Sequence, residues 1–136
     1  MKETLRRLLR IERLRTAAMQ AAAADVARAE AQRCELTALA ERTRRLAGCY
    51  GQLPGPVDGA ALTQATRFAA GLEHLCGSTS ADAERACEHA DQQLLVLAEA
   101  ENGRATVADR AAALRQRIAA RARSPRLEAR RRWHES

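Results

Sequence analysis

The sequence predicts an all-α protein that forms a long antiparallel two-helix coiled-coil hairpin. Three observations lead to this prediction. Hydrophobic residues make up 46% of the 136-residue chain, yet Tyr50, Phe68 and Trp133 are its only aromatic residues, so the apolar side chains are mostly small. Apolar residues recur at alternating spacings of three and four, which is the pattern of a coiled-coil seam. A single Gly/Pro cluster divides the chain into two such stretches, rich in the strong helix formers Ala, Leu, Glu and Arg.

The first helix is expected over residues 3–52. Its heptad stripe is clearest from Leu36 onward, and the same register continues upstream to Leu8. Leu14 and Val26 lie one position off this stripe, which predicts a drift of phase near Arg15. The expected seam residues are Leu8, Ile11, Arg15, Ala18, Ala22, Asp25, Ala29, Gln32, Leu36, Leu39, Thr43, Leu46, Tyr50 and Leu53.

A tight turn is expected at residues 53–58. Gly48 and Gly51 supply a helix C-terminus, because glycine adopts positive φ at low cost. Pro54 and Pro56 cannot continue the helical hydrogen-bond ladder. This cluster is the strongest break in the sequence.

The second helix is expected over residues 59–123, with a kink or restart at 77–80, where Thr79 and Asp82 resemble a weak capping box. A slip of register is expected at 99–104, and Ser124-Pro125 is expected to end the helix before a basic tail, 124–136. The expected seam residues are Leu62, Ala65, Phe68 or Ala69, Leu72, Leu75, Ala83, Ala86, Ala90, Leu94, Leu97, Val107, Ala111, Leu114 and Ile118.

Folding the two stretches back on each other covers both stripes and makes 1–136 one coiled-coil domain, which we expect to be monomeric in isolation. Residues 1–56 carry a net charge of +5, residues 57–103 carry −6, and residues 104–136 carry +7. In a hairpin the two basic blocks meet at the end that holds both termini, and the other end is acidic. Each end is therefore expected to address a different partner.

The sequence contains no pattern of an enzyme, cofactor site or metal site. Four cysteines, at 34, 49, 76 and 87, include no Cys-x-x-Cys pair, and we expect free thiols. His74 and Cys76 are two residues apart, as are Cys87 and His89, and such pairs point about 200° apart on a helix. No apolar run is long enough to span a bilayer, and the arginine-rich start does not resemble a secretory signal, so a cytoplasmic location is expected.

Two further function classes stay open at this point. The first is nucleic-acid binding, which the basic ends would suit, since the C-terminal end holds a cluster of arginines beside Trp133: Arg126, Arg130, Arg131 and Arg132. No nucleic-acid-binding module is recognisable, however, and a nucleic acid is not expected as a partner. The N-terminal helix also suits an anionic membrane surface. A generic coiled-coil adaptor or scaffold subunit is the other alternative.

The order of four features resembles the FliJ family of flagellar type III export proteins, whose relatives include injectisome stalk proteins. These features are a Leu-rich start at 5–14, Leu46 and Tyr50 before the turn, Phe68 and Leu72 on the return helix, and an Arg/Glu/Arg tail at 126–135. The sequence departs from the family pattern at Gly71 and Gly77 and in having arginine at tail positions where lysine and glutamine are common.

The resemblance implies a non-enzymatic stalk or adaptor that links the hexameric flagellar export ATPase to the cytoplasmic domain of the export gate. Escort of export chaperones is also attributed to this family. The protein would then be peripheral at the cytoplasmic face of the inner membrane, held there through its partners. By the same resemblance, Phe68 and Leu72, with Leu75 beside them, would face the export gate.

The paired basic termini would engage the ATPase ring. The residues expected there are Arg7, Arg10, Arg13, Arg117, Arg121 and Arg130. Two interpretations of Phe68 remain open. Either it seals the hairpin against Tyr50 and Leu46, or it is partly exposed and anchors a partner, because Ala65, Ala69, Ala70 and Gly71 leave a shallow surface around it.

Overall fold

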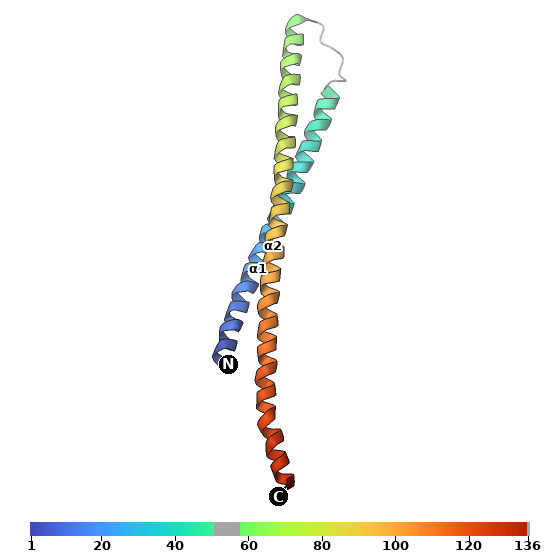
Figure 1. The fold of residues 1–136 in the computed structure, drawn as a ribbon. Coiled ribbons are helices and arrows are strands. Elements are labelled where there is room, and N and C mark those ends of the chain that lie inside the picture. The colour runs from blue at the N-terminus through green and yellow to red at the C-terminus, as the bar shows by residue number, and fades with distance from the viewer. Residues whose placement is uncertain (51–57, 136) are drawn as a thin grey trace. The chain divides into compact units, whose positions relative to one another are not determined.

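The protein is an all-α helical hairpin. A computed structural model describes residues 1–50 and 58–135, and the side chains of these residues except 125–128, 134 and 135 (Figure 1). Helix α1 runs from Lys2 to Tyr50, and helix α2 runs from Gly59 to Glu135. No strand occurs in the described ranges. The expected turn lies almost entirely outside the described residues, as does Leu53 of the expected seam.

Asp58 caps the N-terminus of α2. Its Oδ1 accepts a hydrogen bond of 2.6 Å from the backbone N–H of Ala61, and its carbonyl oxygen accepts one of 3.1 Å from the N–H of Leu62. An aspartate at this position satisfies an otherwise unpaired N–H and places a negative charge at the positive end of the helix dipole. The acidic residue next to Gly59 therefore sets where α2 begins.

Helix α2 is continuous through 77–80, so the expected restart there is wrong. Thr79 does not cap a new helix. Its hydroxyl donates to the carbonyl of Leu75 at 2.9 Å, one turn earlier in the same helix. A Cβ built on Gly77 would meet nothing within 4 Å, so no contact requires a glycine there. The residues on both sides are packed against α1, and this tertiary packing outweighs the weak helix propensity of Gly-Ser-Thr-Ser.

Replacing Gly77 by alanine is expected to stabilise the hairpin by about 1 kcal/mol, because alanine loses less conformational entropy in a helix and fits the open space. Thermal unfolding followed by circular dichroism at 222 nm should show a midpoint higher by a few degrees. A lower midpoint would contradict the regular helix at this position.

Helix α2 also continues past Ser124 and Pro125 to Glu135, so the expected end at 123 is wrong. A proline removes one backbone hydrogen bond and crowds the preceding turn, but it does not by itself end a helix. The flanking residues are mostly Ala, Arg, Leu and Glu, which favour the helix on both sides. The basic tail is therefore the last part of α2.

The contacts divide the hairpin into two units, each an antiparallel pair of helix segments. Unit 1 combines the α1 segment up to Ala23 with the α2 segment from Val96 onward, and unit 2 comprises 24–95. Within unit 1, a Cβ at Gly103 would lie 3.2 Å from Nη1 of Arg15. Within unit 2, the rings of Tyr50 and Phe68 are 4.3 Å apart between centroids. The two helices run in opposite directions past each other in both units.

The buried core consists of small residues. Among the residues whose burial the structure describes, six alanines and two threonines are buried, and no large side chain is fully buried. These residues are Ala22, Ala29, Ala40, Ala86, Ala90, Ala111, Thr43 and Thr79. Small side chains let two helix backbones approach closely, while the larger residues beside them cover the edges of the seam. The apolar area buried per residue is small, because the two helices contact each other along a single line.

The seam on α1 differs from the expected stripe at every second position. Leu36 and Thr43 face α2 as expected, but Ala40 and Ala47 accompany them in place of Leu39 and Leu46. The same register holds upstream without the expected drift near Arg15: Met19, Ala22, Val26 and Ala29 are buried or half-buried. Ala18 is exposed, and Val26 lies in the seam that the sequence pattern had assigned to Asp25.

The seam on α2 follows most of its expected residues. Ala83, Ala86, Ala90, Leu97, Val107, Ala111, Leu114 and Ile118 are buried or half-buried. Leu94 is an error, because it is exposed and its neighbour Gln93 takes the seam position. The expected slip of register at 99–104 does not occur, because half-buried Ala100 and Arg104 keep the alternating spacing of three and four. The Nε atom of Arg104 is buried and has no hydrogen-bond partner among the described residues.

Candidate functional site

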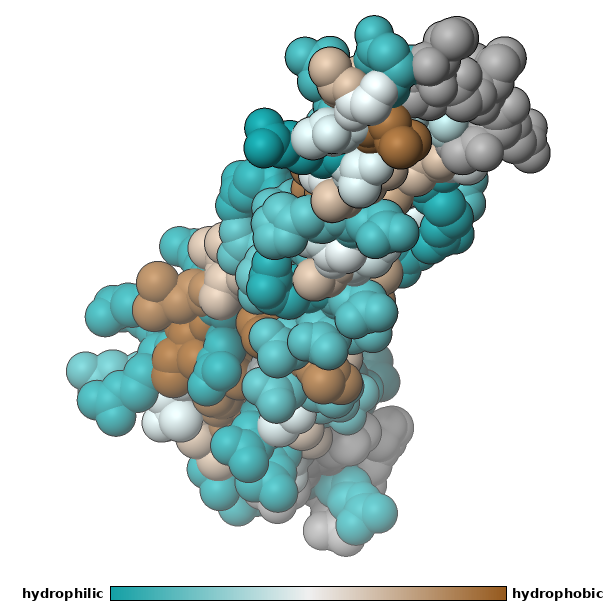
Figure 2. Space-filling view, turned by 90° about the horizontal axis from the view of Figure 1, so that it is seen from above, coloured by the Kyte–Doolittle hydropathy of each residue, from teal (hydrophilic) through white to brown (hydrophobic). Residues whose placement is uncertain are grey.

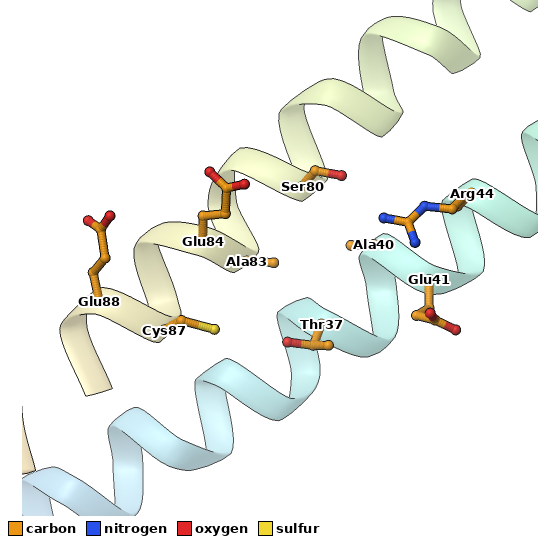
Figure 3. A pocket seen from close by; sticks show the side chains of 9 residues that line it. All are labelled: Thr37, Ala40, Glu41, Arg44, Ser80, Ala83, Glu84, Cys87 and Glu88. Atoms are coloured by element: carbon orange, nitrogen blue, oxygen red, sulfur yellow. The ribbon is translucent and has the colours of Figure 1, made fainter. Parts of the chain in front are cut away.

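One edge of the helix pair in unit 2 is polar. An open groove there is lined by Thr37, Arg44, Ser80 and Cys87 around the buried contact of Ala40 (Figure 3). In Figure 3 the Cys87 thiol and the Thr37 hydroxyl point into the space between the helices, whereas the carboxylates of nearby Glu84 and Glu88 point away from it. The lining contains a thiol but no histidine to activate it. This groove therefore has no nucleophile–base pair.

The opposite edge of unit 2 is apolar over part of its length, next to a polar groove. Residues two apart on a helix point about 200° apart, so Leu39 and Leu46 project away from the polar edge that holds Thr37 and Arg44. Leu39 lies one heptad after Gln32, which lines a second groove together with Asp82 on α2. Leu75 lies one heptad before Asp82 and therefore shares this edge.

Phe68 lies one heptad before Leu75 and extends the same edge to the end of unit 2. It pairs with Tyr50 at an interplanar angle of 36°, and both rings line a shallow hollow with Ala61 and Ala65. We define the apolar face as Leu39, Leu46, Tyr50, Phe68 and Leu75. The exposed fractions of these five side chains lie between 40% and 57%. Figure 2 shows apolar residues reaching the surface among hydrophilic ones.

The three residues expected to face the export gate differ in how exposed they are. Phe68 and Leu75 are about half exposed, and Leu72 is half-buried toward the seam. Both interpretations of Phe68 stay predictions: its ring contacts Tyr50, and 49% of its surface is exposed. Leu39 and Leu46 join this face although the sequence pattern had placed them in the seam. The signal that could have found them is the alternative stripe through Ala40 and Ala47.

Mostly uncharged residues border the apolar face on α2, and Arg67 lines the hollow beside Phe68. Three residues spaced seven apart border Phe68 and Leu75 on the outer side of the helix: Gln64, Gly71 and Ser78. All three are exposed, and a Cβ added to Gly71 would meet nothing within 4 Å. An exposed apolar surface rimmed by polar residues is typical of a protein-binding site.

The six arginines expected at the ATPase-facing end all belong to unit 1 and are all exposed. Arg7 and Arg10 line a shallow depression together with Glu3, Thr4 and Arg6 on the first turns of α1. Gly103 lies beside Arg15, and both helices rise ~1.5 Å per residue, so the start of α1 is level with about residue 117 of α2. The structure thus brings Arg117 and Arg121 close to the start of α1.

Arg130 is not part of that cluster. It lies on the stretch of α2 that runs past the start of α1 in unit 1 (Figure 1), about 20 Å along the helix axis from the level of Lys2. We call residues 118–135 the basic extension. Its exposed side chains include Arg121, Arg123, Arg130 and Arg131, and Trp133 is 85% exposed.

The described part of the chain has neither a disulfide nor a metal-binding cluster. Its Cys34, Cys49, Cys76 and Cys87 are free thiols, and it holds no group of three or more His, Cys, Asp or Glu side chains suited to a metal ion. None of its helices contains a stretch long and apolar enough to cross a bilayer. The apolar face and the basic end of unit 1 are therefore the two candidate sites.

No protein-family model, no curated protein and no solved structure matches this chain.

Proposed function

We propose that this protein is a non-enzymatic stalk of a type III export apparatus, of the kind found in bacterial flagella. In this role the basic end of unit 1 engages the hexameric export ATPase, and the apolar face of unit 2 engages the cytoplasmic domain of the export gate. The protein is then peripheral at the cytoplasmic face of the inner membrane through its partners, and export chaperones are additional candidates for binding.

The observation that carries the proposal is that two chemically different docking surfaces lie in different units. The apolar face has half-exposed aromatic and leucine side chains, which are the residue types that anchor protein interfaces. The basic end has arginines on both helices and on the stretch of α2 that runs past the start of α1. A protein that binds one partner through hydrophobic contacts and another through charge is suited to linking the two.

The family resemblance supports the same assignment of surfaces. Phe68 and Leu72 correspond to the apolar pair that the family places toward the gate, and the paired termini correspond to its ATPase-facing end. A thin alanine seam flanked by open grooves also suits a mechanical or adaptor role better than catalysis, because an enzyme needs a desolvated pocket.

The proposal is tested by reversing charge at the basic end. Replacing Arg117 and Arg121 together by glutamate is expected to abolish stimulation of ATP hydrolysis by the purified export ATPase. Both side chains are exposed on α2, so the far-ultraviolet circular dichroism spectrum should not change. The assay belongs near physiological ionic strength, since salt screens contacts between exposed charges.

The matched control replaces Arg42 and Arg44 by glutamate, which makes the same change in charge within unit 2. This variant should stimulate the ATPase as the unchanged protein does. Full stimulation by the Arg117/Arg121 variant would exclude this end as the ATPase-facing surface, and equal loss in both variants would indicate a response to net charge alone.

A nucleic acid is the second candidate partner for the basic extension. Trp133 is 85% exposed next to exposed arginines, and aromatic and arginine side chains together suit stacking and phosphate contacts. Retention of DNA that falls steeply with salt, and that is lost on removal of 118–136, would favour this function over the stalk. If the protein does not retain DNA at physiological salt, nucleic-acid binding is excluded as its function.

A further inference from the structure

Gly71 lies in the middle of the exposed row formed by Phe68 and Leu75 on α2. The three residues have helical spacings of three and four, so they share one face of the helix. Glycine inside a helix costs about 1 kcal/mol relative to alanine, because it loses more backbone freedom. Its φ is not positive, and an added Cβ would meet nothing within 4 Å. Nothing within the hairpin therefore requires glycine at this position.

A missing Cβ on an exposed helix face allows another backbone to approach closely. The distance between packed helix axes depends on the side chains at the point of contact, and it is shortest where these are smallest. Phe68 and Leu75 would flank such a contact on either side of Gly71, one turn away in each direction. This places the centre of a docked element over Gly71.

Helix α1 provides the second wall of the same site. Leu39 and Leu46 are half exposed on the same edge of unit 2, seven residues apart, as are Phe68 and Leu75 on α2. The two rows run along neighbouring antiparallel helices, with Tyr50 joining them at the aromatic pair. An element that lies along this edge contacts both helices at once.

The size of the apolar face identifies the kind of occupant. Five side chains of this size, each about half exposed, offer only several hundred Å² of surface, whereas a stable dimer interface takes about 800 Å² from each partner. A second copy of this chain is therefore too large a partner for this face alone. The face extends from Leu39 to Tyr50, which is about 16 Å or three helical turns.

We propose that the apolar face binds the apolar side of one amphipathic partner helix of about three turns, packed against both α1 and α2 with its backbone close to Gly71. This inference rests on the proposed function, because it describes how the export gate would be bound. It adds that Leu39 and Leu46 of α1 belong to the site and that Gly71 is required for close packing.

The test compares three variants in binding to the purified cytoplasmic domain of the export gate, measured by calorimetry. Gly71→Ala is expected to raise the unfolding midpoint by a few degrees and yet to weaken binding at least fivefold, since the new methyl group occupies the contact. Gly77 lies outside the row formed by Phe68, Gly71 and Leu75. The Gly77→Ala variant should therefore raise the unfolding midpoint by the same amount without changing the affinity for the gate domain. The double variant Leu39→Ala with Leu46→Ala should weaken binding at least tenfold while the helix content is retained.

The outcomes separate this inference from the proposed function. If the unchanged protein binds the gate domain and both the Gly71 and the Leu39/Leu46 variants bind equally well, the partner-helix site is wrong while the stalk function stands. If the unchanged protein does not bind the gate domain, both are overturned. A dimer in light scattering that Gly71→Ala dissociates would overturn the inference in favour of a second copy.

Discussion

Replacing Ala90 by aspartate is expected to unfold unit 2. Ala90 has 0% exposure, the lowest value among the core residues that the structure describes. A carboxylate at this position would have to be desolvated within the alanine seam, and burying a charge costs several kcal/mol. A core made of small side chains has little stability with which to offset this cost.

The expected measurement is loss of the cooperative thermal transition and of most helical signal at 222 nm in the Ala90→Asp protein at 25 °C. Gln92→Asp introduces the same charge two residues later on the exposed side of α2 and should unfold within a few degrees of the unchanged protein. A folded Ala90→Asp protein with an unchanged midpoint would show that the alanine seam does not hold the helices together.

Replacing Phe68 by alanine is expected to cause the largest loss of gate binding among single substitutions, at least tenfold. Half of the ring is exposed, so the folded state loses only part of its burial together with the contact to Tyr50. The expected cost in stability is about 1–2 kcal/mol, below the 3–5 kcal/mol that is usual for a fully buried phenylalanine. The gate would lose an aromatic anchor, whose removal usually dominates the binding energy.

Calorimetric titration of the gate domain and thermal unfolding of the same samples separate the two effects. Leu14→Ala is the matched control, because Leu14 is also an exposed apolar residue but belongs to unit 1. It should change neither property. A large loss of stability in the Phe68→Ala protein with unimpaired gate binding would show that Phe68 only seals the hairpin.

The sequence alone was sufficient to predict two long helices separated by one break. Helix formers dominate the chain, and the 3,4 spacing of apolar residues extends over both stretches, so local propensity and periodicity agree. The predicted start of α2 was also right, because Asp58 and Gly59 come shortly after Pro56 and an aspartate is a strong helix cap. These features depend on residues that are close together in the sequence, so the sequence pattern alone can predict them.

The sequence alone was not sufficient to choose the seam or the end of α2. Leu39 and Ala40 both fit a 3,4 stripe, as do Leu46 and Ala47, and hydrophobicity favours the leucines. In the folded hairpin the alanines are buried, because two backbones approach most closely over small side chains and the leucines then cover the edge. Continuity through 77–80 was likewise decided by packing against α1, which overrode a weak local signal.

This choice of seam also decides the candidate site. The hydrophobic pattern alone determined that leucines and Phe68 lie on the apolar side of each helix, but it left open whether that side is covered. Only the tertiary structure places Leu39, Leu46, Phe68 and Leu75 together on an exposed edge. The physical reason is that a helix pair has just one line of contact, so an apolar stripe wider than that line must leave part of itself at the surface.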